Sequence, residues 1–279
     1  MTIFDNHLHL SPSGRGWRAV EDFKKEGGTH IMLSHLPYSH CPVLGTGSFE
    51  KQYEVTLGIA REVREKTGVG VMVSLGPYPV ELLSLAEAVG LQKAEKMMKD
   101  GMDMAARRVA GGEAHAIGEV GRPHFLVEPA VLEASNRILL YGMQKAADVG
   151  CPVVVHCESS PGTWASLASI ADEAGLPRGR VVKHYSSPVV DETENKGIMP
   201  SILAGRDALL KAFKQGTRFM METDYLDDPT RPGAVLDIRT VPKRARWLLE
   251  SGISDASLDT VFRKNPEDMY GVELLPGKP

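Results

Sequence analysis

Short apolar segments alternate with longer amphipathic ones along the whole chain, and this alternation restricts the possible folds more than any other feature. Eight segments are apolar enough to be buried strands: 4–10, 30–33, 70–75, 114–119, 152–156, 180–184, 197–204 and 217–224. Apolar residues at helical spacing separate or follow them, at 17–25, 53–66, 80–109, 132–146, 163–174, 207–214, 241–250, 255–263 and 265–270.

Strands that alternate with helices in this way pair in parallel, because each helix carries the chain back to the same edge of the sheet. Eight such units in 279 residues suit one large domain of about 250 residues. We therefore predict a single α/β domain over 1–279, a TIM-like (β/α)8 barrel with parallel strands surrounded by helices. An open doubly wound sheet is the alternative.

Ionisable side chains stand at the ends of several of these strands. His7 and His9 are two residues apart, so both imidazoles point to one face of the first strand. The later strands end in other candidate metal ligands, namely Glu119, His156, His184 and Asp224. Taken singly, each is better explained as a helix cap, a solvated carboxylate or a strand-end histidine than as a ligand. Gathered on one rim of a barrel, these polar side chains need a binding partner that compensates for their burial, and a metal ion is such a partner.

This donor set indicates the kind of metal and the chemistry. Imidazole and carboxylate ligands together suit Zn, Mn, Fe or Co, while Mg prefers more oxygen. Six ligands exceed one tetrahedral site and suit two ions that share one carboxylate. Two ions about 3.5–4 Å apart can activate a water and hold the attacking and leaving oxygens, which predicts hydrolysis.

Composition narrows the functional classes. The net charge of -4 predicts no general nucleic-acid-binding face, although a local basic patch is compatible with it. No apolar run reaches the roughly 18 residues of a membrane span, and no basic-then-apolar leader begins the chain. Cys41, Cys151 and Cys157 form no Cys-x-x-Cys pair, which predicts free thiols and a cytoplasmic location. The sequence specifies no oligomeric state.

Several short motifs, spread over nearly the whole chain, add a resemblance. They are DNHLHL at 5–10, IGEVG at 117–121, PVVVHC at 152–157, VKH at 182–184, ETD at 222–224 and NP at 265–266. In these motifs and their order the chain resembles the TatD family of metal-dependent hydrolases, within the wider amidohydrolase-like superfamily. The resemblance implies a TIM-like barrel with one or two divalent metal ions, Zn, Mn or Mg.

Carried over by position, the resemblance also implies roles for the candidate residues. It assigns His7, His9 and Asp224 to one metal, His156 and His184 to the second, and Glu119 to both as a bridge. Asp224 and Glu119 are then the catalytic residues, with Asp224 taking the proton of the attacking water. Glu222 matches a position that orients a ligand. The implied activity is deoxyribonuclease-like hydrolysis of phosphodiesters, with a small-molecule or nucleic-acid phosphoester as substrate.

The chain departs from the family pattern near the expected site. The common Gly-Leu-Asp after the glutamate is replaced by Gly121-Arg122-Pro123, followed by His124, and the arginine after the fifth strand by Glu158. His184 is followed by Tyr185 and Ser186 in place of the family's Cys-Phe. Glu158 is expected to repel a phosphate, whereas Arg122 is expected to compensate or to be a solvent-exposed loop residue.

Two alternative functions follow from these departures. The first is a hydrolase of carboxylic esters, lactones or amides on the same binuclear barrel; the second is a non-catalytic, metal-bound barrel. A PHP-type phosphoesterase is disfavoured, because no histidine follows His184. Lys183 precedes His184 and is expected to point away from it, so it is not predicted to bridge metals. His35 and His40 lie in a long loop, where they either line the pocket or are incidental surface residues.

Overall fold

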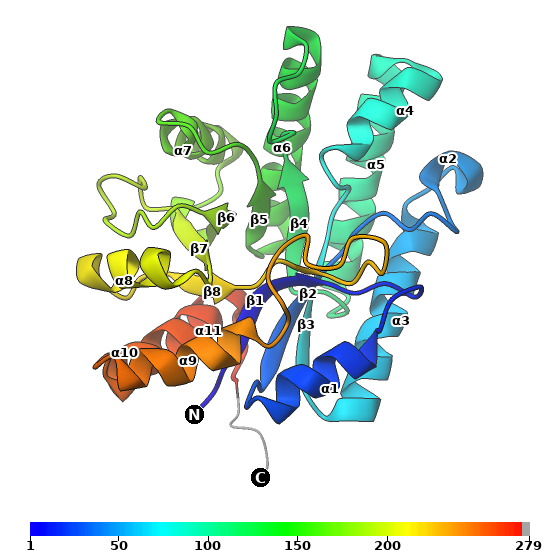
Figure 1. Cartoon of the computed structure of the whole chain (residues 1–279). Helices are drawn as coiled ribbons and strands as arrows, with labels where there is room; N and C mark the ends of the chain where they lie inside the picture. The colour runs from blue at the N-terminus through cyan, green and yellow to red at the C-terminus, as the bar shows by residue number, and fades with distance from the viewer. Residues whose placement is uncertain (275–279) are drawn as a thin grey trace.

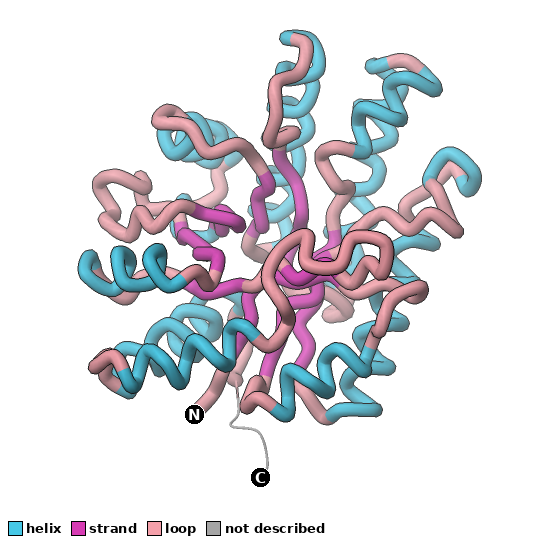
Figure 2. Tube along the Cα trace, viewed as in Figure 1, coloured by secondary structure: helices cyan, strands magenta, loops and turns pink. Residues whose placement is uncertain are grey.

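The computed structural model describes residues 1–274, and in them a parallel sheet is surrounded by helices (Figures 1 and 2). Its strands are β1 (Phe4–His9), β2 (His30–Ser34), β3 (Gly70–Leu75), β4 (Ala116–Gly121), β5 (Val153–His156), β6 (Val181–Ser186), β7 (Met199–Leu203), β8 (Met220–Glu222) and β9 (Tyr225–Leu226). The strand order is β8-β7-β6-β5-β4-β3-β2-β1-β9.

The sheet curls on itself, because β9, which directly follows β8 in the chain, pairs with β1 at the opposite end of the strand order. On its other side β1 pairs with β2. All neighbours in the sheet are parallel, and β9 follows β8 after only two residues. The predicted TIM-like barrel is therefore confirmed, and the open doubly wound sheet is not. The predicted eighth strand at 217–224 is shorter than expected and is interrupted by Thr223 and Asp224, where Asp224 has φ 49°.

The outer layer consists of helices α1 (Trp17–Lys25), α2 (Val43–Thr46), α3 (Glu50–Thr67), α4 (Glu81–Val89), α5 (Leu91–Ala110), α6 (Pro129–Val149), α7 (Thr163–Ala174), α8 (Arg206–Gln215), α9 (Thr240–Glu250), α10 (Asp255–Asp259) and α11 (Asn265–Tyr270). The bounds predicted for α1 and α7 are confirmed. The helical segments predicted over 80–109 are confirmed as two helices, α4 and α5, which Gly90 at φ 84° separates. Within 1–274, none of the helices has both the length and the apolarity needed to cross a membrane.

The barrel interior is apolar at one end and polar at the other. Residues near the strand beginnings, such as Phe4, Met32 and Val154, pack together against Met269 and Tyr270 of α11. This cluster fills the end at which the strands enter. The polar residues of β1 and β4 come later in their strands, so they lie at the carboxyl end, where TIM barrels place their active sites.

One connection departs from the regular barrel pattern. Helices follow β5 and β7, but residues 187–198 after β6 form a loop without a helix. Asn195 is buried in this loop, and its side-chain amide donates to the carbonyls of Val189 and Val190. The loop takes the place of a helix in the outer layer, next to α7 (Figure 1).

Candidate metal centre

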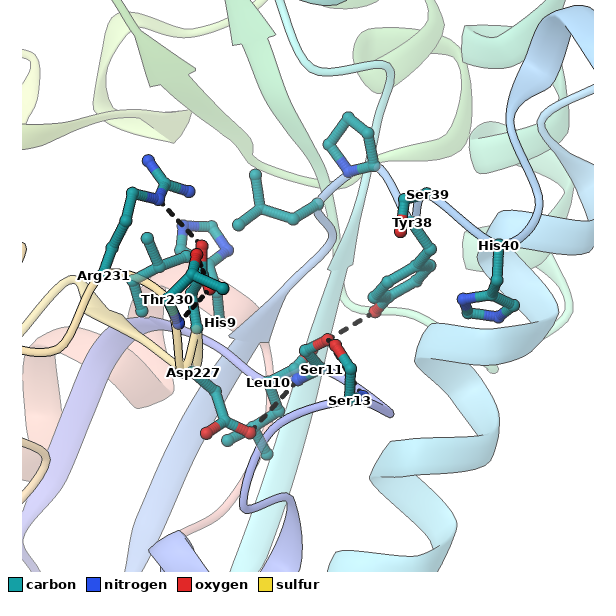
Figure 3. A pocket seen from close by; sticks show the side chains of 14 residues that line it. His9, Leu10, Ser11, Ser13, Tyr38, Ser39, His40, Asp227, Thr230 and Arg231 are labelled. Carbon is teal, nitrogen blue, oxygen red and sulfur yellow. Dashed lines mark hydrogen bonds and ion pairs between the residues drawn. The ribbon is translucent and has the colours of Figure 1, made fainter.

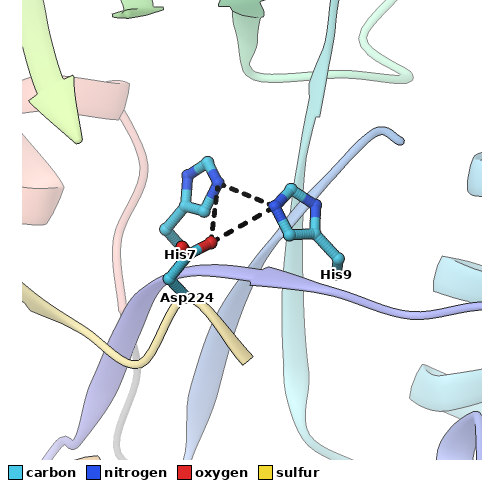
Figure 4. Close-up of side chains that lie close together, drawn as sticks. All are labelled: His7, His9 and Asp224. Atoms are coloured by element: carbon cyan, nitrogen blue, oxygen red, sulfur yellow. Dashed lines mark hydrogen bonds and ion pairs between the residues drawn. The ribbon is translucent and has the colours of Figure 1, made fainter. Parts of the chain in front are cut away.

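The first donor cluster joins β1 to the junction between β8 and β9. Figure 4 shows the side chains of His7, His9 and Asp224 turned toward one another. Nε2 of His7 lies 3.2 Å from Nε2 of His9. Oδ1 of Asp224 lies 3.4 Å from Nε2 of His9 and 3.9 Å from Nε2 of His7. These three atoms are close enough to hold one cation between them.

The second donor cluster comes from the ends of β4, β5 and β6. Nδ1 of His156 lies 2.9 Å from Nε2 of His184 and 3.3 Å from Oε2 of Glu119. The other oxygen of Glu119, Oε1, lies 2.6 Å from Nε2 of His7 in the first cluster. The Glu119 carboxylate therefore lies between the two clusters, as a bridging ligand must. The structure brings all six predicted donors together.

The chemistry of the six donors fits divalent metal ions. Oε2 of Glu119 and Nδ1 of His184 are buried without a hydrogen-bond partner in the described part of the chain. Burial raises the pKa of the Glu119 carboxyl, but the imidazoles of His184 and His7 outweigh it and hold the pKa well below its usual value. Burial lowers the pKa of His184 well below its usual value. An ionised carboxylate and a neutral imidazole are the forms that bind metals.

The carboxylates of Asp224 and Glu119 favour a positive charge beside His9. Burial lowers the pKa of His9, but the carboxylates of Asp224 and Glu119 outweigh this effect and raise it to about 10. Burial also raises the pKa of Asp224, but the hydrogen bond with His9 and the nearby imidazoles lower it overall. Without another cation, the cluster therefore attracts a proton onto His9. One or two divalent ions satisfy the same demand, so these residues fit the metals that the family resemblance implies.

Ser34, at the end of β2, fixes the two histidines of β1. Its hydroxyl lies 3.1 Å from Nδ1 of His7, and its backbone carbonyl lies 3.0 Å from Nδ1 of His9. Both rings are therefore held by one nitrogen and present the other to the donor cluster. Ser34 was not among the predicted site residues. The signal that could have found it is its position at the end of an apolar strand.

Replacing Ser34 with alanine is expected to weaken metal binding about tenfold, since loss of an outer hydrogen bond to a ligand typically lowers affinity 10–100-fold. Titration of metal into the chelator-treated variant measures this effect. Ser74 is the matched control, because it pairs with Ser34 in the next strand and its buried hydroxyl has no partner in residues 1–274. Equal affinities of the Ser34→Ala and Ser74→Ala variants would contradict the orienting role.

Glu222 lies beside both clusters, because one of its oxygens is within 4.8 Å of a ring nitrogen of His7 and of His184, and neighbouring groups hold it in place. One oxygen accepts from the backbone N–H of Tyr185 at 2.6 Å, and the other accepts from the Ser201 hydroxyl. Oε1 also lies 3.4 Å from Nδ1 of His184. This arrangement agrees with the expectation that Glu222 orients a ligand.

Asp5 positions the junction that carries Asp224. Its carboxylate accepts from the backbone N–H of Thr223 at 2.9 Å and from the Thr223 hydroxyl at 2.6 Å. The backbone N–H of Asp224 donates to the carbonyl of His7 at 2.9 Å. The two halves of the first cluster are thus tied together through the backbone. Asp5 was not among the predicted site residues, although it is the first residue of the motif at 5–10.

Arg122 and Glu158, the two departures from the family pattern, form an ion pair. Nη2 and Nε of Arg122 donate to the two carboxylate oxygens of Glu158 at 2.8 and 3.1 Å. A further nitrogen of Arg122 donates to Asn136 and Ser166, and only 4% of the residue is exposed. The interpretation of Arg122 as a solvent-exposed arginine is therefore wrong. Because the two charges pair with each other, Glu158 is not a free charge that repels a phosphate, and Arg122 is not free to bind one.

The two histidines of the long loop have different places. His35 is buried, with Nδ1 2.8 Å from the Thr56 hydroxyl and Nε2 3.1 Å from the Gln52 side chain. Both its nitrogens are occupied, and burial lowers its pKa to about 3, so His35 is a neutral core residue. His40 lines a cavity of about 390 Å³ that His9 also borders (Figure 3). Arg231 lies across that cavity, where it pairs with Asp228 at 2.8 Å.

A second cavity, of about 380 Å³, opens directly onto both donor clusters. Asp224 of the first cluster and His156 and His184 of the second all line it. Tyr78, which follows β3, also lines it, with its ring 5.3 Å from that of His156. Nδ1 of His124 lies 2.9 Å from Nε2 of His156. A molecule in this cavity contacts donors of both clusters, namely Asp224, His156 and His184, and Tyr78 and His124 are part of the cavity wall.

Comparison with known proteins agrees with this architecture. A sequence family described as TatD related DNase matches residues 4–271. The uncharacterized protein MJ1127 of Methanocaldococcus jannaschii is 34% identical over 279 residues, which are 98% of this chain and 97% of the relative. Both matches extend over almost the entire chain, and the family match spans the positions of all six predicted ligands.

Solved structures with the same fold include two bacterial proteins. The phosphotriesterase homology protein from Escherichia coli, solved with phosphate in its active site, has a TM-score of 0.63 and 15% identity, covering 96% of this chain and 98% of that one. The organophosphorus hydrolase from Deinococcus radiodurans has a TM-score of 0.67 and 13% identity, covering 96% and 92%. At such identities the likeness establishes the barrel fold.

Proposed function

The chain belongs to the family of TatD-related DNases, and from this premise we propose that it is a metal-dependent hydrolase of ester bonds, phosphodiesters first. One observation carries the proposal: six donor side chains form two clusters that share Glu119. In the proposal, His7, His9 and Asp224 hold one ion, His156 and His184 hold the other, and Glu119 contacts both. Divalent ions so held polarise an ester and make water nucleophilic near neutral pH.

Protein side chains have the other proposed roles in hydrolysis: accepting a proton, orienting the ligands and enclosing the substrate. Asp224 is ionised and lines the substrate cavity, so its carboxylate is placed to accept the proton of an attacking water. Ser34 contacts His7 and Glu222 lies beside His184, so these two residues hold imidazoles of the two clusters in place relative to Asp224. Tyr78 and His124 form the walls between which the ester lies. The three free cysteines are in keeping with a cytoplasmic enzyme.

A phosphodiester is favoured by the family and by the phosphate in the active site of the Escherichia coli relative in fold. A specific observation favours the second candidate, a carboxylic ester or lactone. Arg122 pairs with Glu158, and Arg231 pairs with Asp228, so these arginines offer no uncompensated charge to an anionic substrate. One of the neighbours in fold is a mutant of a PTE-like lactonase from Deinococcus radiodurans.

A substrate panel tests the proposal on metal-loaded protein. Bis(p-nitrophenyl) phosphate, p-nitrophenyl acetate and a γ-lactone are assayed side by side, with linear and supercoiled DNA as macromolecular substrates. We expect kcat/KM to be at least tenfold higher for the phosphodiester than for either carboxylic ester. The reverse order would establish the second candidate. No hydrolysis of any member, with two metal equivalents bound, would contradict the enzymatic role.

A further inference from the structure

A third cavity, of about 530 Å³, lies outside the two donor clusters, between α7 and the loop 187–198 that replaces a helix after β6. Lys183 lines it, whereas His184, the next residue of β6, belongs to the second cluster. Neighbouring residues of a strand point to opposite faces, so the two sites are separated by the barrel wall. Only Ser159, in the loop after β5, lines both this cavity and the one at the donor clusters.

Lys183 is the unusual residue in this cavity. Only 2% of it is exposed, and its ammonium makes one weak contact, 3.4 Å from the Ser159 hydroxyl. No carboxylate of residues 1–274 lies within ion-pair distance of it. A largely buried ammonium without a counter-charge is unfavourable, because one long hydrogen bond, to Ser159, replaces only part of its hydration. The cavity in front of it is the place where an anion can supply that partner.

The amino terminus of α7 faces the same cavity. The helix is 12 residues long and begins at Thr163 after Gly162, and no side chain of the described residues caps it. Thr163 and Trp164, its first two residues, line the cavity. The N–H of Thr163 donates to the Ser160 carbonyl at 3.1 Å and its hydroxyl donates to Glu158 at 3.1 Å, so the groups that can attract an anion here are the next N–H groups and the helix dipole. The two exposed charges of the outer lining, Glu194 and Lys196, have opposite signs and cancel.

We propose that Lys183 and the amino terminus of α7 bind a phosphate group carried by a small organic molecule. The lysine and the helix end supply the charge and the donors that a phosphate needs. The cavity has the volume of an ordinary small-molecule site, about 300–1,000 Å³, which leaves room for an organic portion beside the largely buried ring of Trp164. The bound molecule contacts Ser159, which also lines the cavity at the donor clusters.

Calorimetric titration with phenylphosphonate and with inorganic phosphate tests this proposal on metal-loaded protein. Phenylphosphonate has no hydrolysable ester, so its heat reports binding alone. We expect Lys183→Met to weaken phenylphosphonate at least tenfold and Lys183→Arg to retain most of the affinity. His156→Ala, which alters the metal centre, is expected to leave this binding unchanged. Tighter binding of phenylphosphonate than of inorganic phosphate identifies a carried phosphate, and the reverse order a free one.

Two results would overturn the proposal: unchanged affinity in Lys183→Met, or loss of binding in His156→Ala alone, which would place the phosphonate at the metals. Should Lys183→Met fail to fold, the chain with Trp17→Phe and Trp247→Phe keeps Lys183 and leaves Trp164 as the only tryptophan. Its fluorescence is then expected to change with the same saturation as the calorimetric signal. Constant fluorescence at saturating phenylphosphonate would also overturn the proposal. None of these measurements depends on hydrolysis, so they stand apart from the proposed function.

Discussion

Replacing Asp224 with asparagine is expected to lower kcat for the best substrate of the panel by about 10²–10⁴-fold while most of the bound metal is retained. Asparagine keeps the shape of the side chain and one oxygen that still faces His9, 3.4 Å away in the native protein. It cannot accept the proton of an attacking water, which is the role proposed for the carboxylate. Steady-state kinetics beside metal analysis by mass spectrometry separates the two effects.

Asp237→Asn is the matched control for this experiment. It makes the same chemical change at an exposed carboxylate that pairs with Arg239 and lies outside the donor clusters. We expect its kcat and metal content to equal those of the unmodified protein. If Asp224→Asn retained full activity, Asp224 would not be the proton acceptor. If it lost both activity and metal, Asp224 would act mainly as a ligand.

The barrel could be predicted from the sequence because its signals are local and repeated. Each buried strand is a short apolar run, and each ligand stands at the end of such a run, so one periodic pattern specifies both the sheet and the rim. His7, His9, Glu119, His156 and His184 all lie within a strand, at or near its carboxyl end. The prediction rested on the six residues together, because a single histidine or carboxylate in a sequence cannot be told apart from a capping or surface residue.

The features that could not be predicted depend on contacts between distant segments. Arg122 and Glu158 are 36 residues apart, and only the folded chain brings them into a bidentate pair that neutralises both charges. His35 looked like a candidate pocket residue in a loop, but its partners come from α3, which buries it. Lys183 was predicted to point away from His184, but its lack of a counter-charge depends on which side chains the folded chain brings around it, and the sequence alone does not specify them.

The place of Glu119 between the clusters leads to the second large prediction: Glu119→Gln is expected to lower the metal content from near two equivalents to one or fewer. In the native protein, Oε1 lies 2.6 Å from His7 and Oε2 lies 3.3 Å from His156. A glutamine presents one oxygen and one NH₂ group, so it can serve one cluster and turns a donor toward the other. It also removes the negative charge that balances two divalent ions in a buried site. Metal analysis after dialysis against Zn or Mn measures the loss.

Glu81→Gln provides the comparison, because Glu81 is also a largely buried carboxylate with one unpartnered oxygen in the described residues, and burial raises its pKa to about 7. It lies at the start of α4, away from all six donors, so its substitution is expected to leave the metal content unchanged. Equal loss in both variants would point to general destabilisation, which circular dichroism and thermal unfolding of the metal-free proteins would reveal. Two equivalents retained by Glu119→Gln would mean that each cluster holds its ion without a shared carboxylate, and the binuclear mechanism would lose its central residue.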